Sequence, residues 1–135
     1  MSQPDVIAEL AEQARHTGRL GIDTEFMGEG RYRALLCLIQ VSVQETDDPA
    51  GPARVEVLDP LKGRLDPGPL AGVLADPAIE IYMHAARQDV ALLRREWRTD
   101  VTSLFDTQVA AGFAGMRAQL GYDALLHELV GVRLR

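Results

Sequence analysis

The sequence of 135 residues is poor in cysteine and contains no long apolar run. Cys37 is the only cysteine, so no disulfide can form within the chain, and a reducing, cytoplasmic compartment is expected. Because no run reaches about 18 apolar residues, we expect no segment that spans a membrane. The N-terminus is polar and acidic, without the basic start and apolar centre of a secretory signal.

A surplus of positive charge is also missing. The chain has 14 Lys and Arg against 20 Asp and Glu, for a net charge of −6. This balance argues against a protein that coats nucleic acid by general attraction, but it allows a site that grips phosphates through bound metal ions. Zinc is not expected, because His16, His84 and His127 are scattered and Cys37 lies within an apolar run.

What is present is enough apolar sequence, 47%, for one core but not for two domains. Three strands come first, and helices then alternate with strands, which predicts an α/β fold with a mixed sheet and flanking helices. The predicted strands cover 19–26, 34–43, 54–58, 80–83 and 103–105, and the predicted helices cover 3–17, 67–75, 86–97, 107–114 and 122–130. The 34–43 strand is nearly continuously apolar, which favours burial on both of its faces.

The first strand carries two acidic residues on one face. Side chains alternate along a strand, so Leu20, Ile22, Thr24 and Phe26 share one face, while Asp23 and Glu25 share the other. Two carboxylates roughly 6.6 Å apart at the backbone can converge on one point, and they repel unless a proton or a cation lies between them. A solvated face with no function is the simpler interpretation of such a strand taken alone.

The helix over 86–97 supports the functional interpretation. Its buried face is formed by Ala86, Val90, Leu93 and Trp97, and Asp89 projects into the same apolar arc. A carboxylate there costs several kcal/mol unless it is paired or liganded. An arginine partner or a helix cap would be the ordinary explanation. The alternative is a three-carboxylate site of Asp23, Glu25 and Asp89, whose oxygen-only ligands suit Mg²⁺ or Mn²⁺.

Such a cluster can hold two ions about 3.5–4 Å apart. One ion then prepares hydroxide for in-line attack on a phosphodiester, and the other stabilises the leaving oxygen.

Several ordered blocks of the chain resemble ribonuclease D, a member of the DEDD superfamily of 3′–5′ exonucleases. The blocks are Ile22-Asp23-Thr24-Glu25-Phe26, Leu36-Cys37-Leu38-Ile39-Gln40-Val41, His84-Ala85-Ala86-Arg87-Gln88-Asp89-Val90, Phe105-Asp106-Thr107-Gln108 and Gly121-Tyr122-Asp123-Ala124-Leu125-Leu126. The resemblance implies an RNase H-like sheet, two metal ions and removal of single nucleotides from RNA 3′ ends, typically of tRNA precursors.

Carried over by position, the resemblance makes Asp23, Glu25 and Asp89 the catalytic and metal-binding residues. It places Phe26 and Met27 against the terminal nucleotide. Arg31 and Tyr32 could contact a phosphate and stack on a base, although a solvated loop is an equal alternative.

The resemblance also implies a third motif, with a Tyr and an Asp on a helix beyond Arg135. We therefore expect residues 1–135 to form a single exonuclease domain that lacks its C-terminal end and is impaired in activity. A DNA 3′–5′ exonuclease and a non-catalytic module that binds nucleic acid or a partner protein remain alternatives. We expect structural roles for His84, for Asp106 as a helix cap, for Tyr122 and for Gln40.

Overall fold

A computed structural model describes residues 2–28, 35–63, 65–116 and 119–132. The strands and helices agree with the expected α/β order. They are α1 (Gln3–Thr17), β1 (Arg19–Met27), β2 (Leu35–Gln44), β3 (Ala53–Leu58), α2 (Gly68–Ala75), β4 (Glu80–Met83), α3 (Arg87–Trp97), β5 (Leu104–Asp106), α4 (Thr107–Phe113) and α5 (Tyr122–Val130).

The five strands form one mixed sheet in the order β3-β2-β1-β4-β5, so β1 is the central strand. β1 pairs antiparallel with β2, and β2 pairs antiparallel with β3. β4 runs parallel to β1, and β5 runs parallel to β4. The expected meander followed by two helix-connected parallel strands is therefore confirmed.

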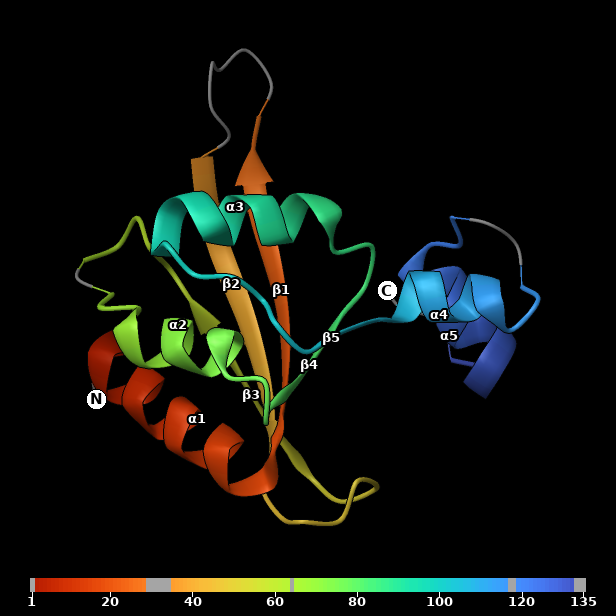
Figure 1. The fold of residues 1–135 in the computed structure, drawn as a ribbon, viewed down its shortest axis with the longest axis horizontal. Coiled ribbons are helices and arrows are strands. Elements are labelled where there is room, and N and C mark those ends of the chain that lie inside the picture. The colour runs from red at the N-terminus through yellow and green to blue at the C-terminus, as the bar shows by residue number, and fades with distance from the viewer. Residues whose placement is uncertain (1, 29–34, 64, 117–118, 133–135) are drawn as a thin grey trace.

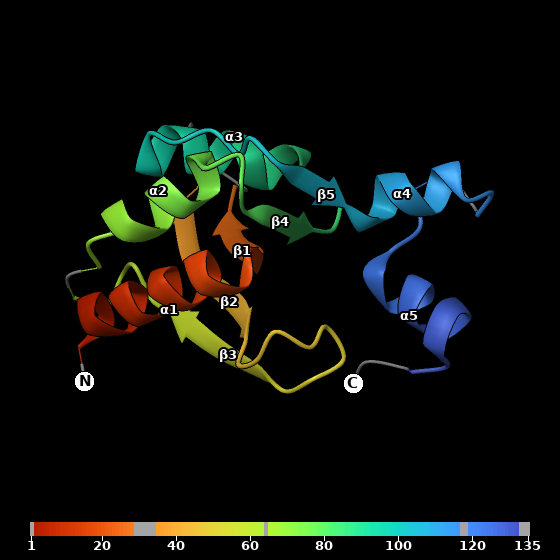
Figure 2. The same ribbon diagram turned by 60° about the horizontal axis from the view of Figure 1, so that its bottom comes forward.

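The helices α1, α2 and α3 all lie over one face of the sheet (Figures 1 and 2). The core lies between them and the strands, with Leu20, Ile39 and Ile81 among its fully buried side chains. The opposite face of the sheet is open on β3, where Val55 and Val57 are more than half exposed.

The expectation that the second strand is buried on both faces was wrong. Ile39, Val41 and Val43 on β2 are buried, but Gln40 between them is exposed. An apolar run is compatible with one covered face or with two, and here none of the described helices covers the second face. Gln40 therefore does not need the buried polar partners expected for it.

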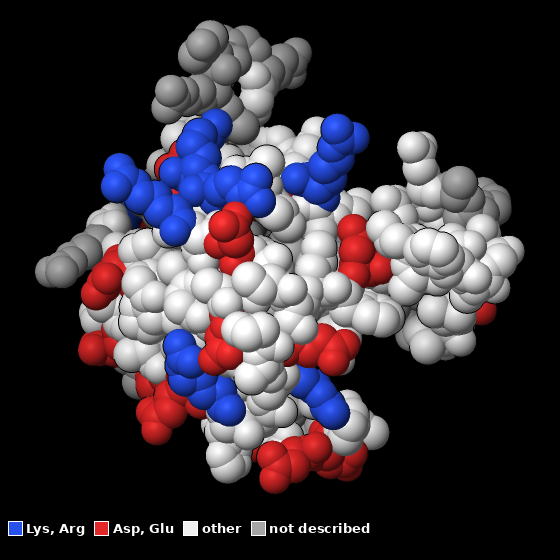
Figure 3. All heavy atoms as spheres, in the orientation of Figure 1, with Lys and Arg blue, Asp and Glu red and all other residues white. Residues whose placement is uncertain are grey.

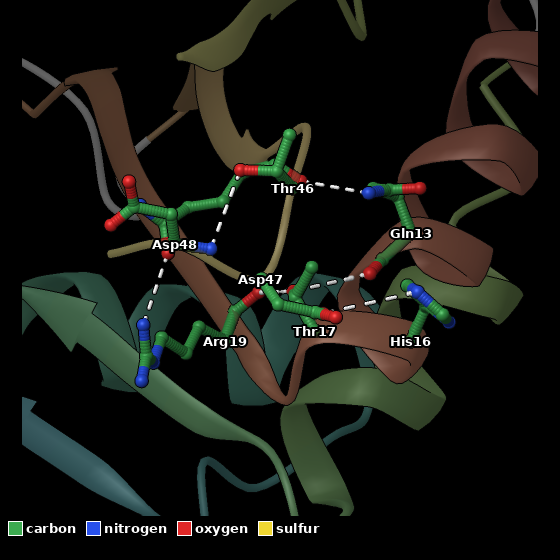
Figure 4. Close-up of polar contacts among 8 residues, drawn as sticks. Gln13, His16, Thr17, Arg19, Thr46, Asp47 and Asp48 are labelled. Atoms are coloured by element: carbon green, nitrogen blue, oxygen red, sulfur yellow. Dashed lines mark hydrogen bonds and ion pairs between the residues drawn. The ribbon is translucent and has the colours of Figure 1, made fainter. Parts of the chain in front are cut away.

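The helix α1 begins and ends at the residues that the sequence indicates. Ser2 and Asp5 form a reciprocal capping box, and Gly18 closes the helix with a φ of 76°, which glycine adopts without strain. Polar contacts tie its C-terminal end to the loop after β2 (Figure 4). Gln13 Nε2 donates to the carbonyl oxygen of Gln44 (2.8 Å), and His16 Nε2 lies 3.9 Å from Asp47 Oδ1. The Gln13 hydrogen bond joins the helix to the end of β2, and the buried residues Ile7, Leu10 and Ala14 hold it against the sheet.

The helices α4 and α5 stand beside the sheet, beyond β5 (Figures 1 and 2). They share a small apolar cluster of Ala111, Leu120 and Leu125, separate from the main core. Within the described residues, no helix has both the length and the apolar character needed to cross a membrane.

Candidate active site

The central strand β1 places Asp23 and Glu25 where the sequence predicts them. Both are exposed, whereas Ile22 and Thr24 are buried, so the strand alternates between its two faces as expected. Asp23 lies opposite Gln40 of β2, and Glu25 lies opposite Leu38. A register shift follows Glu25, because the pairing of β1 with β2 slips by one residue between Glu25 and Phe26. The two carboxylates therefore stand on the open face, beside an irregularity of the sheet.

Asp89 is buried on α3, as its position on the helical wheel predicts. Its side chain lies in the first turn of the helix and only 7% of it is exposed. Among the described residues, Asp89 is the only charged residue in the buried class. No ion pair within the described ranges includes Asp89, so none of the arginines that the structure describes compensates its charge.

Thr24 is the hydrogen-bond partner of Asp89. The Thr24 hydroxyl donates to Asp89 Oδ1, which joins the central strand to α3 across 65 positions of sequence. Both residues are nearly inaccessible to water. Thr24 was not among the predicted site residues, although a signal was present. It is the polar member of the otherwise apolar face formed with Leu20 and Ile22, and a buried hydroxyl needs a partner.

Burial raises the pKa of the Asp89 carboxyl above its ordinary value. The Thr24 hydrogen bond opposes that effect by favouring the ionised form, while repulsion from Asp23 and Glu25 adds to the rise in pKa. The negative charges of the two strand carboxylates are therefore close enough to Asp89 to act on its ionisation. A cation among the three would lower the cost of keeping Asp89 charged.

The three carboxylates do not form a closed cluster. Across residues 2–28, 35–63, 65–116 and 119–132, no group of three or more His, Cys, Asp or Glu side chains is arranged to hold a metal ion. Asp23 and Glu25 lie on the open side of β1, and Asp89 contacts Thr24 on the covered side. Coulomb repulsion opposes closer approach of three carboxylates unless a cation lies between them.

The predicted substrate-binding residues have different outcomes. Phe26 is partly buried against the main core. Met27, at the end of β1, is 55% exposed and is available for contact. Arg31 and Tyr32 lie outside the described residues.

Three residues expected to be structural are placed by hydrogen bonds and ring contacts. Both ring nitrogens of His84 have oxygen partners, Nδ1 at 2.7 Å from Thr107 Oγ1 and Nε2 at 2.8 Å from the Leu120 carbonyl oxygen. The ring of Tyr122 meets His84 edge-on. Asp106 accepts from the backbone N–H groups of Gln108 and Val109, which confirms that it caps α4.

Known proteins resemble this chain over nearly its whole length. A family described as "3'-5' exonuclease" matches residues 1–135. Ribonuclease D of Granulibacter bethesdensis is 37% identical over 131 residues, which cover 97% of this chain and 31% of that protein. The crystal structure of Escherichia coli RNase D has a TM-score of 0.83 at 30% identity, covering 97% of this chain and 32% of that one. The catalytic core of RRP6 from Trypanosoma brucei has a TM-score of 0.79 at 25% identity, covering 99% and 34%.

The fold and these matches define the class of the protein as a nuclease domain with an RNase H-like sheet. The chain belongs to the 3′–5′ exonuclease family, and its resemblance to ribonuclease D is confirmed. The family is metal-dependent. The chain spans about a third of the length of the curated relatives that it matches.

Proposed function

We propose that this chain is the catalytic domain of a 3′–5′ exoribonuclease that removes nucleotides from RNA 3′ ends by metal-dependent hydrolysis. The observation that carries the proposal is the buried Asp89, which accepts a hydrogen bond from Thr24, the residue between Asp23 and Glu25 on the central strand. A buried carboxylate without an ion-pair partner is costly unless a bound cation compensates its charge. Residues 1–135 then form one domain, with tRNA 3′ ends among its expected substrates.

The donor set fits a hard divalent cation, because it consists of carboxylate oxygens from Asp23, Glu25 and Asp89. Joint binding to one site requires side-chain movement, since these carboxylates are not grouped in the described structure. When bound, Mg²⁺ or Mn²⁺ supplies an activated water and stabilises the leaving oxygen. The chain's own contribution is to orient the carboxylates, and Thr24 holds Asp89 towards β1.

The exposed side of α3, the helix that carries Asp89, suits an anionic substrate. The exposed arginines of α3 are Arg87, Arg94 and Arg95, and Arg98 follows at its C-cap. Basic side chains gather over this helix in Figure 3, although the chain as a whole carries a net charge of −6. Arg94 pairs with Asp100 at 2.6 Å and Arg95 pairs with Glu96 at 2.8 Å, so part of this charge is already compensated. The remaining positive potential favours a phosphate backbone close to α3.

The test is trimming of a 5′-labelled single-stranded RNA with a free 3′ hydroxyl in Mn²⁺. We expect a ladder of products that shorten by one nucleotide at a time. A matched RNA with a blocked 3′ end is the control and should stay intact. Trimming that Asp89→Asn leaves unchanged would refute the proposal.

A non-catalytic nucleic-acid-binding module is the second candidate. The lack of a closed metal-binding group among the described residues favours it. Such a module would bind the same RNA with or without Mn²⁺ and would leave it uncut, with Asp89→Asn having no effect on binding. A DNA strand of the same sequence, used in parallel, separates the exoribonuclease from a DNA exonuclease.

A further inference from the structure

The chain makes an unusual turn between β4 and α3. Ala85 has a φ of +54°, a left-handed conformation that is uncommon for a residue with a side chain. Ala86 follows in the right-handed region, with φ −77° and ψ −7°. Successive left-handed and right-handed residues direct their two N–H groups to one side, which creates a concavity that binds anions.

The carboxylate of Asp106 occupies this concavity. Its Oδ1 accepts from the Ala85 N–H (3.0 Å), and its Oδ2 accepts from the Ala86 N–H (2.7 Å). Asp106 comes from the end of β5, so it is about 20 positions distant in sequence from the turn that it holds. The anion in this concavity is therefore a carboxylate of the protein itself, and we call its two hydrogen bonds to Ala85 and Ala86 the clamp.

The same carboxylate also caps α4. Its Oδ1 accepts from Gln108 N–H at 2.9 Å and from Val109 N–H at 3.4 Å. Burial raises the pKa of Asp106, but the four backbone donors together outweigh burial, so the pKa lies below its ordinary value. One charged side chain thus fixes the starts of two helices.

The start of α3 determines where Asp89 lies. Ala86 is the N-cap residue, its carbonyl oxygen accepts from Val90 N–H (2.8 Å), and Asp89 lies in the same first turn. A shift of the Ala85–Ala86 turn would therefore move Asp89 relative to Thr24 and the strand carboxylates. We propose that Asp106 is a positioning residue for Asp89, clamping the first turn of α3 so that the Asp89 carboxylate faces β1. This inference rests on the proposed function.

Asp106→Asn should weaken the clamp on Ala85 and Ala86 while keeping the cap of α4. The asparagine carbonyl oxygen can take the place of Oδ1 and keep the contacts to Ala85, Gln108 and Val109. Its NH₂ group then takes the place of Oδ2 and faces the Ala86 N–H, donor against donor. The matched control is Ser2→Ala, which removes the side-chain cap of α1 at the far end of the chain. Asp106→Ser is the second variant if Asp106→Asn does not fold, because serine is a good helix cap but has a single oxygen.

Two readouts distinguish positioning from a merely structural role. The first is amide hydrogen exchange, with Val90 reporting the first turn of α3 and Val6, which donates to the Ser2 carbonyl oxygen, reporting that of α1. The second is the affinity for Mn²⁺ alone, followed by the electron paramagnetic resonance signal of the free ion. We expect Asp106→Asn to speed exchange at Val90 and to weaken Mn²⁺ binding by about tenfold or more. Ser2→Ala should speed exchange at Val6 and leave Mn²⁺ binding unchanged.

The outcomes that contradict this inference differ from those that contradict the proposed function. If the unsubstituted chain binds Mn²⁺ in a way that requires Asp89, and Asp106→Asn binds it equally well, Asp106 is only a structural cap and the inference is overturned. If Asp89→Asn leaves Mn²⁺ binding unchanged, or if the unsubstituted chain binds none, the proposed function fails and the inference fails with it.

Discussion

Replacing Thr24 by valine would remove the hydroxyl that donates to Asp89 while keeping the shape of the side chain. Thr24 is 6% exposed and Asp89 is 7% exposed, so water has little access to take the place of the lost donor. A hydrogen bond to a charged group contributes about 1.5–3 kcal/mol. We expect Thr24→Val to lower the free energy of unfolding at pH 7 by about this amount.

The assay is urea unfolding followed by the fluorescence of Trp97, the only tryptophan of the chain, which is buried on α3. Thr24→Ser is the matched control, because it keeps the hydroxyl and loses one methyl group, worth about 0.8 kcal/mol. In the Asp89→Asn variant, Thr24→Val should lower the free energy of unfolding by less, about 0.5–1.5 kcal/mol, because the lost hydrogen bond is then between neutral groups. Equal urea midpoints for Thr24→Val and the unsubstituted chain would refute the claim that Thr24 holds Asp89.

Three further predictions concern the carboxylates. Burial, together with repulsion from Asp23 and Glu25, raises the pKa of Asp89 in the folded state. Ionised Asp89 therefore lowers the free energy of unfolding at neutral pH. This loss disappears as the pH falls below the ordinary pKa of Asp, because Asp89 is then protonated in both the folded and the unfolded state. Asp89→Asn should therefore raise the urea midpoint in metal-free buffer at pH 7–8 by more than it does near pH 4, and an equal or larger gain at pH 4 would contradict this. Mg²⁺ or Mn²⁺ should raise the thermal midpoint of the unsubstituted chain, because an ion that binds only the folded state stabilises it by mass action. At an ion concentration of one hundred times the dissociation constant, the free energy of unfolding rises by about 2.7 kcal/mol. Asp23→Asn should abolish that shift with the fold intact, and an equal shift in both proteins would rule out the site. Asp89→Leu should abolish the rise of the thermal midpoint with Mg²⁺ or Mn²⁺. It also leaves the Thr24 hydroxyl without its acceptor, so Thr24→Val should lower the free energy of unfolding less in the Asp89→Leu variant than in the unsubstituted chain.

Much of the fold follows from patterns that a single chain displays. The capping box at Ser2 and the glycine at position 18 mark both ends of α1. The alternation along β1 and the wheel of α3 correctly predict which side of each element is buried, including the burial of Asp89. These features depend on neighbours in sequence, so local physical chemistry is sufficient to predict them.

The remaining features depend on residues that meet only after folding. Residues 39–44 of β2 alternate between apolar and polar side chains, which indicates a strand with one uncovered face, but the continuous apolar run before them favoured burial on both faces, so the exposure of Gln40 was missed. The Thr24–Asp89 bond joins residues 65 positions apart, and the clamp of Asp106 on Ala85 and Ala86 requires the sheet to bring β5 beside β4. The sequence thus predicts the exposure of Asp23 and Glu25 and the burial of Asp89, but not the contacts that position Asp89.

The central claim is that Asp23, Glu25 and Asp89 share bound metal ions. Its most direct test is a crystal structure of this chain grown in Mn²⁺, with the ions located by their anomalous scattering. We predict anomalous peaks within coordination distance of all three carboxylates, and no such peaks in crystals of Asp89→Asn grown under the same conditions. Peaks confined to other surface carboxylates, with Asp89 contacting only Thr24, would contradict the claim.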